Sequence, residues 1–266
     1  MELERISPHL GVRVTGIDLS QVTAADAEEL NALVDKYLVV FFAEQTLEPR
    51  DFLRFGETLG ELEPPEIGAP QQPTLEGDLD RVNYLEVDER IPRGGFADIW
   101  HADGSYFERP SHGALLQPTI LPTVGGDTLW TSTYAAYDAL SDSVRRSLED
   151  LSALHSAGSL AEFVHPIVRV NPSTGRRGLF VNRLFAKLVV GLSEAESRNL
   201  LELLFNHLSS PDFQIRFRWT TDIVAVWDNR FAQHFAVRDY SERRRMLRLA
   251  LAGEKPIGPN EFHPRG

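Results

Sequence analysis

Two residues of metal-ligand type lie two positions apart in Trp100-His101-Ala102-Asp103. In an extended backbone, side chains at such a spacing point to the same face, so His101 and Asp103 can bind one metal ion. A third ligand must come from elsewhere, and the best candidate is His234, at the end of the segment 227–234. Two histidines and one carboxylate on one face of a metal are typical of non-heme Fe(II) oxygenases, because the remaining positions can take cosubstrate and oxygen. A lone His-x-Asp also arises by chance, usually as a hydrogen bond at a strand end, so the motif needs support from the rest of the chain.

The segment from Asp239 to Leu251 contains arginines at the spacing of a strand. With a period of two, Arg244 and Arg248 fall on one face, whereas Arg245 begins the other face, which continues with leucines at 247, 249 and 251. A strand that buries those leucines would direct Arg244 and Arg248 into a common cavity, where guanidinium groups bind anions in bidentate fashion. The alternative is a solvent-facing basic strip whose exposed ion pairs contribute little stability. A metal triad nearby favours the cavity.

The composition limits both the metal chemistry and the partners. The chain has 266 residues and no cysteine, which excludes disulfides, thiolate metal sites and a cysteine nucleophile, so His, Asp or Glu must hold any metal. A formal net charge of -12 disfavours nucleic-acid binding. No apolar run approaches the roughly 18 residues of a membrane span, and the first residues lack the pattern of a signal peptide. We therefore expect a cytoplasmic protein with a small-molecule substrate and no nucleic-acid or membrane partner.

The hydrophobic pattern predicts more strands than helices. Strands are expected at 12–19, 38–42, 81–87, 113–121, 127–132, 178–182, 213–219, 223–227 and 244–251. Helices are expected over about 24–36 after an N-cap at Thr23, from Pro49 to about Gly60, over about 133–150, and from an N-cap at Ser193 to about 208. The stretch between about 150 and 178 reads as irregular. Together these elements indicate one β-rich α+β domain over 1–266, a barrel or double-sheet jelly roll whose interior can hold a ligand.

Proline- and glycine-rich segments flank the His-x-Asp motif. Residues 64–73 cannot form a regular element, and Pro92-Arg93-Gly94-Gly95 is a second joint. Loops over 61–80 and 88–98 are expected either as lids that contact substrate or as surface loops without a role. Six histidines show no ligand spacing and are interpreted as surface or structural residues: His9, His112, His155, His165, His207 and His263.

The chain resembles the TauD/TfdA family of Fe(II)- and 2-oxoglutarate-dependent dioxygenases. The matching segments run in the family's order over nearly the whole chain, and together they are highly specific. They are WHAD at 100–103, GGDTLW at 125–130, AAYDAL at 135–140, HPIVR at 165–169, LFVN at 179–182, WDNRFAQH at 227–234, and RRRMLR followed by GEKP at 243–256.

This resemblance implies a double-stranded β-helix (jelly-roll) core with flanking helices. It implies His101, Asp103 and His234 as ligands of Fe(II), with 2-oxoglutarate as cosubstrate and O2 as oxidant. Thr128 and Arg244 would hold the far carboxylate of 2-oxoglutarate, and Arg248 would face the site and contact an acidic substrate. The implied reaction hydroxylates that substrate and releases succinate and carbon dioxide.

One interval departs from the family pattern. The distance from His234 to the arginine pair is one residue shorter than usual, so counting forward from His234 selects Arg245. Counting back from GEKP selects Arg244 and Arg248. We prefer the second count because it keeps the leucines on the buried face and places the deletion in a loop near Ser241-Glu242, where a change in length costs least.

A second departure concerns the substrate. Taurine-cleaving members resemble each other in polar residues after the G-E-L segment and four residues before the motif histidine. This chain has Pro64, Pro65, Ile67 and Ala97 there. The resulting apolar wall predicts an organic acid with an apolar body, such as a sulfonate, sulfate ester or carboxylate, in preference to taurine.

Two alternatives remain open from the residues alone. A zinc hydrolase also uses two histidines, a carboxylate and a water, but it would not explain Thr128 and the in-phase arginines. A non-catalytic small-ligand-binding protein on the same fold is the other. A homo-oligomer, either a dimer or a tetramer, is also expected, since enzymes of this size often form symmetric assemblies.

Overall fold

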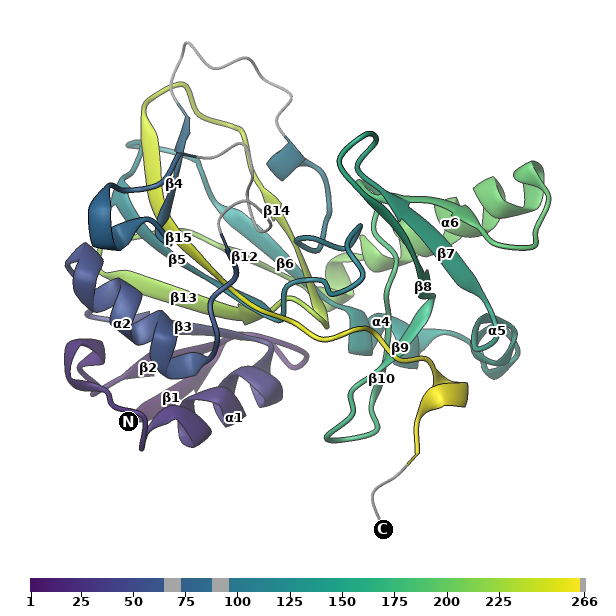
Figure 1. Ribbon diagram of the computed structural model, residues 1–266, viewed down its shortest axis with the longest axis horizontal. Coiled ribbons are helices and arrows are strands. Elements are labelled where there is room, and N and C mark those ends of the chain that lie inside the picture. Colours follow the sequence, from purple (N-terminus) through teal and green to yellow (C-terminus); the bar gives the residue numbers. More distant parts are fainter. Residues whose placement is uncertain (65–72, 88–95, 264–266) are drawn as a thin grey trace.

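The computed structural model describes residues 1–64, 73–87 and 96–263. Its largest element is a seven-stranded sheet with the strand order β1-β2-β3-β13-β5-β15-β4 (Figure 1). Strands β2 and β3 pair in parallel, and the other neighbours in this sheet are antiparallel. In sheet order the strands are β1 (Glu2–Arg5), β2 (Val12–Thr15), β3 (Val39–Ala43), β13 (Ile223–Asp228), β5 (Gly113–Ile120), β15 (Arg244–Leu251) and β4 (Asn83–Val87).

Strand β3 shows why a continuous apolar run forms here in place of an alternating one. Val40 and Phe42 join the hydrophobic core on one face of the large sheet, whereas Val39 and Phe41 join the core on the other face. A strand buried on both faces has no position for a polar side chain. Its composition therefore places it in the middle layer of the molecule.

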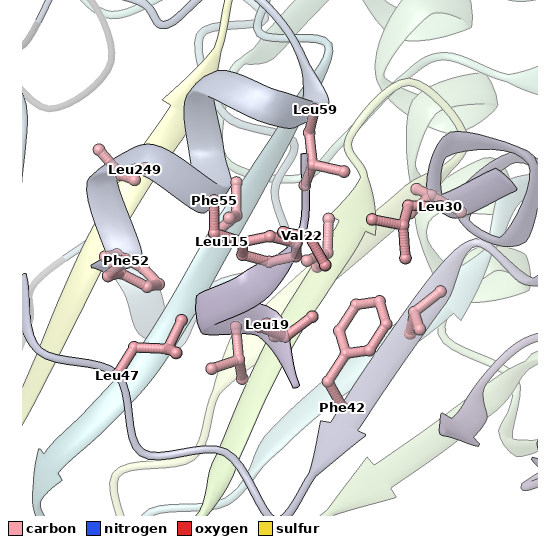
Figure 2. Packing of buried hydrophobic residues seen from close by; sticks show 14 of the residues in the cluster. Leu19, Val22, Leu30, Phe42, Leu47, Phe52, Phe55, Leu59, Leu115 and Leu249 are labelled. Carbon is pink, nitrogen blue, oxygen red and sulfur yellow. The ribbon is translucent and has the colours of Figure 1, made fainter. Parts of the chain in front are cut away.

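Helices cover the first face of the large sheet. Helix α1 (Ala27–Tyr37) and helix α2 (Pro49–Leu59) contribute apolar side chains to this core. Phe52 and Phe55 of α2 lie close to Leu115 and Leu249 of the sheet in Figure 2. Burying side chains of this size contributes roughly 1.5–3 kcal/mol each. Helix α2 thus packs against β15, and helix α1 packs against β3 and β13.

A smaller sheet closes the other face. Its strand order is β12-β6-β14, with β12 (Gln214–Phe217), β6 (Thr128–Ser132) and β14 (Ala232–Ala236). The two sheets share a core in which Trp130 of β6 meets Trp227 of β13, with ring centroids 5.9 Å apart. Two facing sheets form the predicted jelly-roll core, which does not close into a barrel. The predicted fold class is therefore confirmed.

The remaining elements form a third cluster beside this core (Figure 1). Helix α6 (Glu194–Leu208) packs there with its predicted N-cap at Ser193, whose side chain and that of Glu196 form a capping box. The other members are α4 (Thr133–Ala139), α5 (Asp142–Leu148), the sheet of β11 (Ala186–Val189), β7 (Ser152–Ser156) and β8 (Glu162–Pro166), and the pair β9 (Val168–Val170) and β10 (Arg177–Leu179).

Strand β15 has the predicted division of its faces. Leu247, Leu249 and Leu251 join the core beneath α2. Arg244 and Arg248 lie on the opposite face and are only 6% and 4% exposed. The period-two reading of this strand is therefore confirmed, and it brings both guanidinium groups to the interior side.

Several element predictions were wrong in detail. The first helix begins at Ala27 and not at 24, because Thr23 and Asp26 bond to each other in a turn that precedes it. The helical stretch 133–150 is two helices that break around Leu140-Ser141. The region 150–178 was expected to be irregular but contains β7, β8 and β9, and the segment with His234 is strand β14. These short strands are stabilised by pairing with distant segments, which local patterns do not reveal.

Most of the two loops around the motif, 65–72 and 88–95, lies outside the described residues. The lid expectation for these loops therefore stays a prediction. Within the described ranges, no helix combines the length and apolar character that crossing a bilayer requires.

Candidate metal and cosubstrate site

The backbone brings His101 and His234 together. His101 forms an isolated antiparallel bridge with His234, in which His101 N donates to His234 O at 3.1 Å and His234 N donates to His101 O at 2.9 Å. The imidazole centroids lie 4.1 Å apart. The His-x-Asp motif is thus paired to the middle of the small-sheet strand β14, although the two histidines are 133 positions apart in the sequence.

The predicted triad converges on one point. One ligand atom from each of His101, Asp103 and His234 lies within 4.8 Å of the others. Asp103 Oδ1 is 3.6 Å from His101 Nε2 and 3.7 Å from His234 Nε2, which is too long for a hydrogen bond. Ligands at right angles around one ion, with bonds of about 2.1 Å, lie about 3 Å apart. Three lone pairs that converge without a shared proton fit a divalent metal ion.

Hydrogen bonding and burial prepare both imidazoles for a metal. His101 Nδ1 donates to the Ile99 carbonyl at 2.7 Å, which leaves the lone pair on Nε2. Such a contact fixes the ring and raises the basicity of the ligand nitrogen. Burial, and then the neighbouring His101, lower the pKa of His234 to about 3, so its ring is neutral at neutral pH. A neutral imidazole is the form that binds metal.

Asp103 is held from two sides. Its backbone N–H donates to Asn229 Oδ1 at 2.8 Å, and Asn229 Nδ2 returns a bond to the Asp103 carbonyl at 2.9 Å. Arg248 Nη2 donates to Asp103 Oδ2 at 2.9 Å. Burial opposes ionisation of Asp103, but the attraction of Arg248 and the two histidines outweighs it and lowers the carboxyl pKa well below its ordinary value. The carboxylate form, which binds metal, is favoured.

The neighbouring arginines have different environments. Arg244 is buried, its Nε donates to the Gly126 carbonyl at 3.1 Å, and its side chain also forms a hydrogen bond with Tyr240. Arg245 points to the outer side, where its guanidinium lies 4.3 Å from the centroid of the Tyr84 ring and 3.7 Å from a carboxylate oxygen of Glu86. The structure therefore places Arg244, as the count back from GEKP predicted, and not Arg245, on the same strand face as Arg248.

Thr128 starts strand β6, two residues after Gly126, and is buried. Trp219 Nε1 donates to Thr128 Oγ1 at 2.9 Å. Because the hydroxyl oxygen accepts the indole N–H, its own proton is available to donate to an anion. A Cβ on Gly126 would lie 3.2 Å from Arg244 Cδ, so the Arg244 side chain packs against the Gly-Gly turn that precedes Thr128 by two residues.

Replacing Thr128 with valine should weaken 2-oxoglutarate binding by about 1–3 kcal/mol, because one buried hydrogen bond to the carboxylate is lost while the shape is kept. The dissociation constant can be measured by anaerobic titration. Thr119→Val is a suitable control, since the hydroxyl of this exposed threonine donates to the Arg245 carbonyl, on the outer side of the strand. An unchanged affinity in Thr128→Val would remove this hydroxyl from the cosubstrate site.

Comparison with known proteins decides the family. The family model "Taurine catabolism dioxygenase TauD, TfdA family" matches residues 2–250. The chain belongs to the TauD/TfdA family.

The alpha-ketoglutarate-dependent sulfate ester dioxygenase of Pseudomonas putida is 31% identical over 97% of this chain and 91% of its own length. The alpha-ketoglutarate-dependent sulfonate dioxygenase of Saccharomyces cerevisiae is 33% identical over 98% of this chain and 69% of its own length. The crystal structure of a taurine dioxygenase from Burkholderia xenovorans superposes with a TM-score of 0.87 at 31% identity, covering 98% of this chain and 93% of that chain.

Membership of the TauD/TfdA family makes the protein an oxidoreductase that depends on alpha-ketoglutarate, another name for 2-oxoglutarate, and implies Fe(II) and O2. The converging donor set His101, Asp103 and His234 fits that metal. The zinc-hydrolase and non-catalytic alternatives have no comparable support.

Two site residues were missed by the sequence reasoning. Glu63 is buried and its Oε2 accepts from Ser111 Oγ at 2.8 Å. Burial raises its pKa to about 7, and the charges of Arg248 and Asp103 act on it as well. Tyr106 is likewise buried, and burial, followed by the charge of Asp103, raises its pKa to about 12.

Glu63 modifies the predicted apolar wall. Pro64 is exposed and Ala97 is half-buried, whereas Pro65 and Ile67 lie outside the described residues. Glu63, directly before Pro64, contributes a polar group near Arg248. A charged residue between Leu62 and Pro64 was the only local signal for this role, and it is a weak one because most such residues are exposed.

Proposed function

We propose that this chain is an Fe(II)- and 2-oxoglutarate-dependent dioxygenase that hydroxylates a small anionic organic substrate, either a sulfonate, a sulfate ester or a carboxylate, and releases succinate and carbon dioxide. The observation that supports an anionic substrate is the environment of Arg248. Its Nη2 bonds Asp103, but among the described residues its buried Nη1 has no hydrogen-bond partner. A buried guanidinium nitrogen without a partner is costly, so an anionic ligand is expected there.

The proposed roles follow from the positions of the side chains. His101, Asp103 and His234 would hold Fe(II), which when bound supplies the oxidising chemistry with 2-oxoglutarate and O2. Thr128 and Arg244 would hold the far carboxylate of 2-oxoglutarate and so orient it. The protein mainly positions the reactants and excludes water, while the cofactor supplies the chemistry.

The substrate is proposed to have an anionic head at Arg248 and an apolar body. The relatives named as sulfate ester and sulfonate dioxygenases support the anionic head. Arg248 follows Arg244 by four residues on the same face of β15, so it can serve the near carboxylate of 2-oxoglutarate, the substrate, or both. For the apolar body, the support remains the residue types at Pro64, Pro65, Ile67 and Ala97.

An anaerobic titration tests this function directly. Adding Fe(II) and 2-oxoglutarate should give a weak visible charge-transfer band, a correct substrate should perturb the band, and admitting oxygen should release succinate. A zinc hydrolase or a binding protein without iron would give no band. Absence of the band with fully folded protein would therefore reject the proposal.

Turnover measurements with two sulfonates test the predicted apolar body of the substrate. A hydrophobic sulfonate such as 1-pentanesulfonate should be turned over with a higher kcat/KM than taurine, because its body matches the apolar wall while its head group is the same. Because both compounds have a sulfonate head group, a difference in kcat/KM reports on the rest of the substrate. If taurine is preferred by about tenfold or more, equivalent to about 1.4 kcal/mol, the apolar-wall argument fails.

Three further expectations from the sequence stay predictions. They are a single TauD/TfdA-like domain over 1–266, assembly into a homo-oligomer, and a cytoplasmic location without nucleic-acid or membrane partners.

A further inference from the structure

Two of the family-like segments, HPIVR at 165–169 and LFVN at 179–182, have no role in the proposed chemistry. The structure brings them together behind the His-x-Asp motif. His165 and Asn182 are each 1% exposed, and His155 of β7, which packs with them, is fully buried. The sequence reading assigned these histidines no function. All three side chains make hydrogen bonds to one short segment, Gly104–Phe107.

The first bonds hold Ser105. Asn182 Nδ2 donates to Ser105 Oγ at 2.9 Å, and His155 Nδ1 lies 3.0 Å from the same oxygen. Since the hydroxyl accepts from the amide, its own proton is available to donate to His155 Nδ1. Asn182 is itself oriented by the Phe185 N–H, which donates to its Oδ1 at 2.9 Å. Ser105 is fully buried, so these bonds are not exchanged with water.

The second bond holds Phe107. His165 Nε2 donates to the Phe107 carbonyl at 2.9 Å. Phe107 N in turn donates to the Gly104 carbonyl at 2.9 Å, which closes a turn, and Gly104 enters this turn with a positive φ of +64°. Glycine adopts this conformation freely but restrains the chain least. Because Gly104 directly follows Asp103, the orientation of Asp103 depends on contacts farther along the turn.

The histidine pair is closely packed and uncharged. The His155 ring stacks on Phe180 at an interplanar angle of 16°, and His165 meets His155 edge-on at 84°. Burial is the largest cause that lowers the pKa of His155 to about 3 and that of His165 to about 4. Each ring therefore has one N–H and one lone pair at neutral pH. His165 uses its N–H to donate to the Phe107 carbonyl, and His155 uses its lone pair to accept from the Ser105 hydroxyl.

We propose that His155, His165 and Asn182 are positioning residues that clamp the Gly104–Phe107 turn and thereby fix Asp103 in the metal site. The proposal rests on the role proposed above for Asp103 as a metal ligand. The clamp acts from the C-terminal side of Asp103, while Asn229 holds its backbone N–H and carbonyl. The same turn presents Tyr106 toward the site, between the two clamped residues. Residues that orient a ligand in this way commonly affect metal affinity by about 10- to 100-fold.

Mn(II) binding measured by electron paramagnetic resonance tests the clamp without turnover. His165→Phe keeps an aromatic ring but loses the donor to Phe107, and it should weaken Mn(II) binding by about 10- to 100-fold. His165→Gln can place an amide N–H near the same carbonyl and should restore most of the affinity. Ser105→Ala removes the anchor of His155 and Asn182 with a smaller change in packing, and it should also weaken binding. This second variant keeps the test decisive if His165→Phe does not fold.

His207→Phe is the matched control. His207 Nε2 also donates to a backbone carbonyl, that of Ala136 at 2.7 Å, but this bond joins α6 to α4. Its loss should lower the melting temperature and leave Mn(II) affinity unchanged, which separates positioning from general stability. Wild-type affinity in folded His165→Phe or Ser105→Ala would overturn the clamp. If the wild-type protein itself does not bind Mn(II), the proposed metal site fails, and with it the basis of the clamp.

Discussion

Alanine at His101, Asp103 or His234 should each abolish succinate formation, both with substrate and without it, while the fold survives. Among the residues that the structure describes, these three side chains are the ligands that converge, and after the loss of one the remaining two would not keep Fe(II) in the geometry that accepts 2-oxoglutarate and oxygen. We expect a fall of about 10³-fold or more, which corresponds to a loss of about 4 kcal/mol of transition-state stabilisation. Succinate release and Fe(II) content should be measured on each variant.

The fold should survive because the ligand side chains add little to the packed cores. The backbone bridge between His101 and His234 does not depend on their side chains. Asp103→Ala also leaves Arg248 without its carboxylate partner, so Asp103→Asn should be measured beside it. His9→Ala, an exposed histidine, controls for the loss of an imidazole elsewhere. Wild-type activity in any one ligand variant would remove that residue from the triad.

Arg244→Ala should weaken 2-oxoglutarate binding far more than Arg245→Ala. Arg244 is buried beside the Gly126 carbonyl, so its removal would leave the buried carboxylate of 2-oxoglutarate without a cationic partner. Breaking a buried ion pair costs roughly 3–5 kcal/mol. At about 1.4 kcal/mol for each factor of ten, the dissociation constant should rise by about 10²- to 10⁴-fold. Anaerobic titration of the charge-transfer band measures it.

Arg245 is a matched control because it is the same residue type at the next position of the same strand. Its guanidinium lies over Tyr84 and beside Glu86 on the outer side, in a half-buried ion pair at 3.7 Å; pairs of this kind near the surface contribute only about 0–1 kcal/mol. Arg245→Ala should therefore leave the affinity for 2-oxoglutarate unchanged. The opposite result, a large effect in Arg245→Ala and none in Arg244→Ala, would mean that the assigned strand face is wrong.

Local residue types and spacing predict much of the site. The absence of cysteine restricts the ligands to His, Asp and Glu, and the spacing of His101 and Asp103 lets one segment supply two of them. Alternation along 244–251 determines which arginines face inward, since side chains two apart share a face of a strand. The continuous apolar run of β3 likewise indicates burial on both faces. These features depend on a period or a residue type, so they are readable without knowing any long-range contact.

Only the tertiary structure decided which residues from distant parts of the sequence lie in contact. His234 becomes a partner of His101 through a backbone bridge between segments 133 residues apart, and no local pattern encodes that pairing. The strands β7, β8 and β9 looked irregular because their short, mixed sequences are stabilised by neighbours from elsewhere in the chain. Glu63, His155 and His165 have residue types that are usually exposed or half-exposed, and their roles follow from burial. Burial is set by the packing of distant elements, because it is those elements that remove water from a side chain.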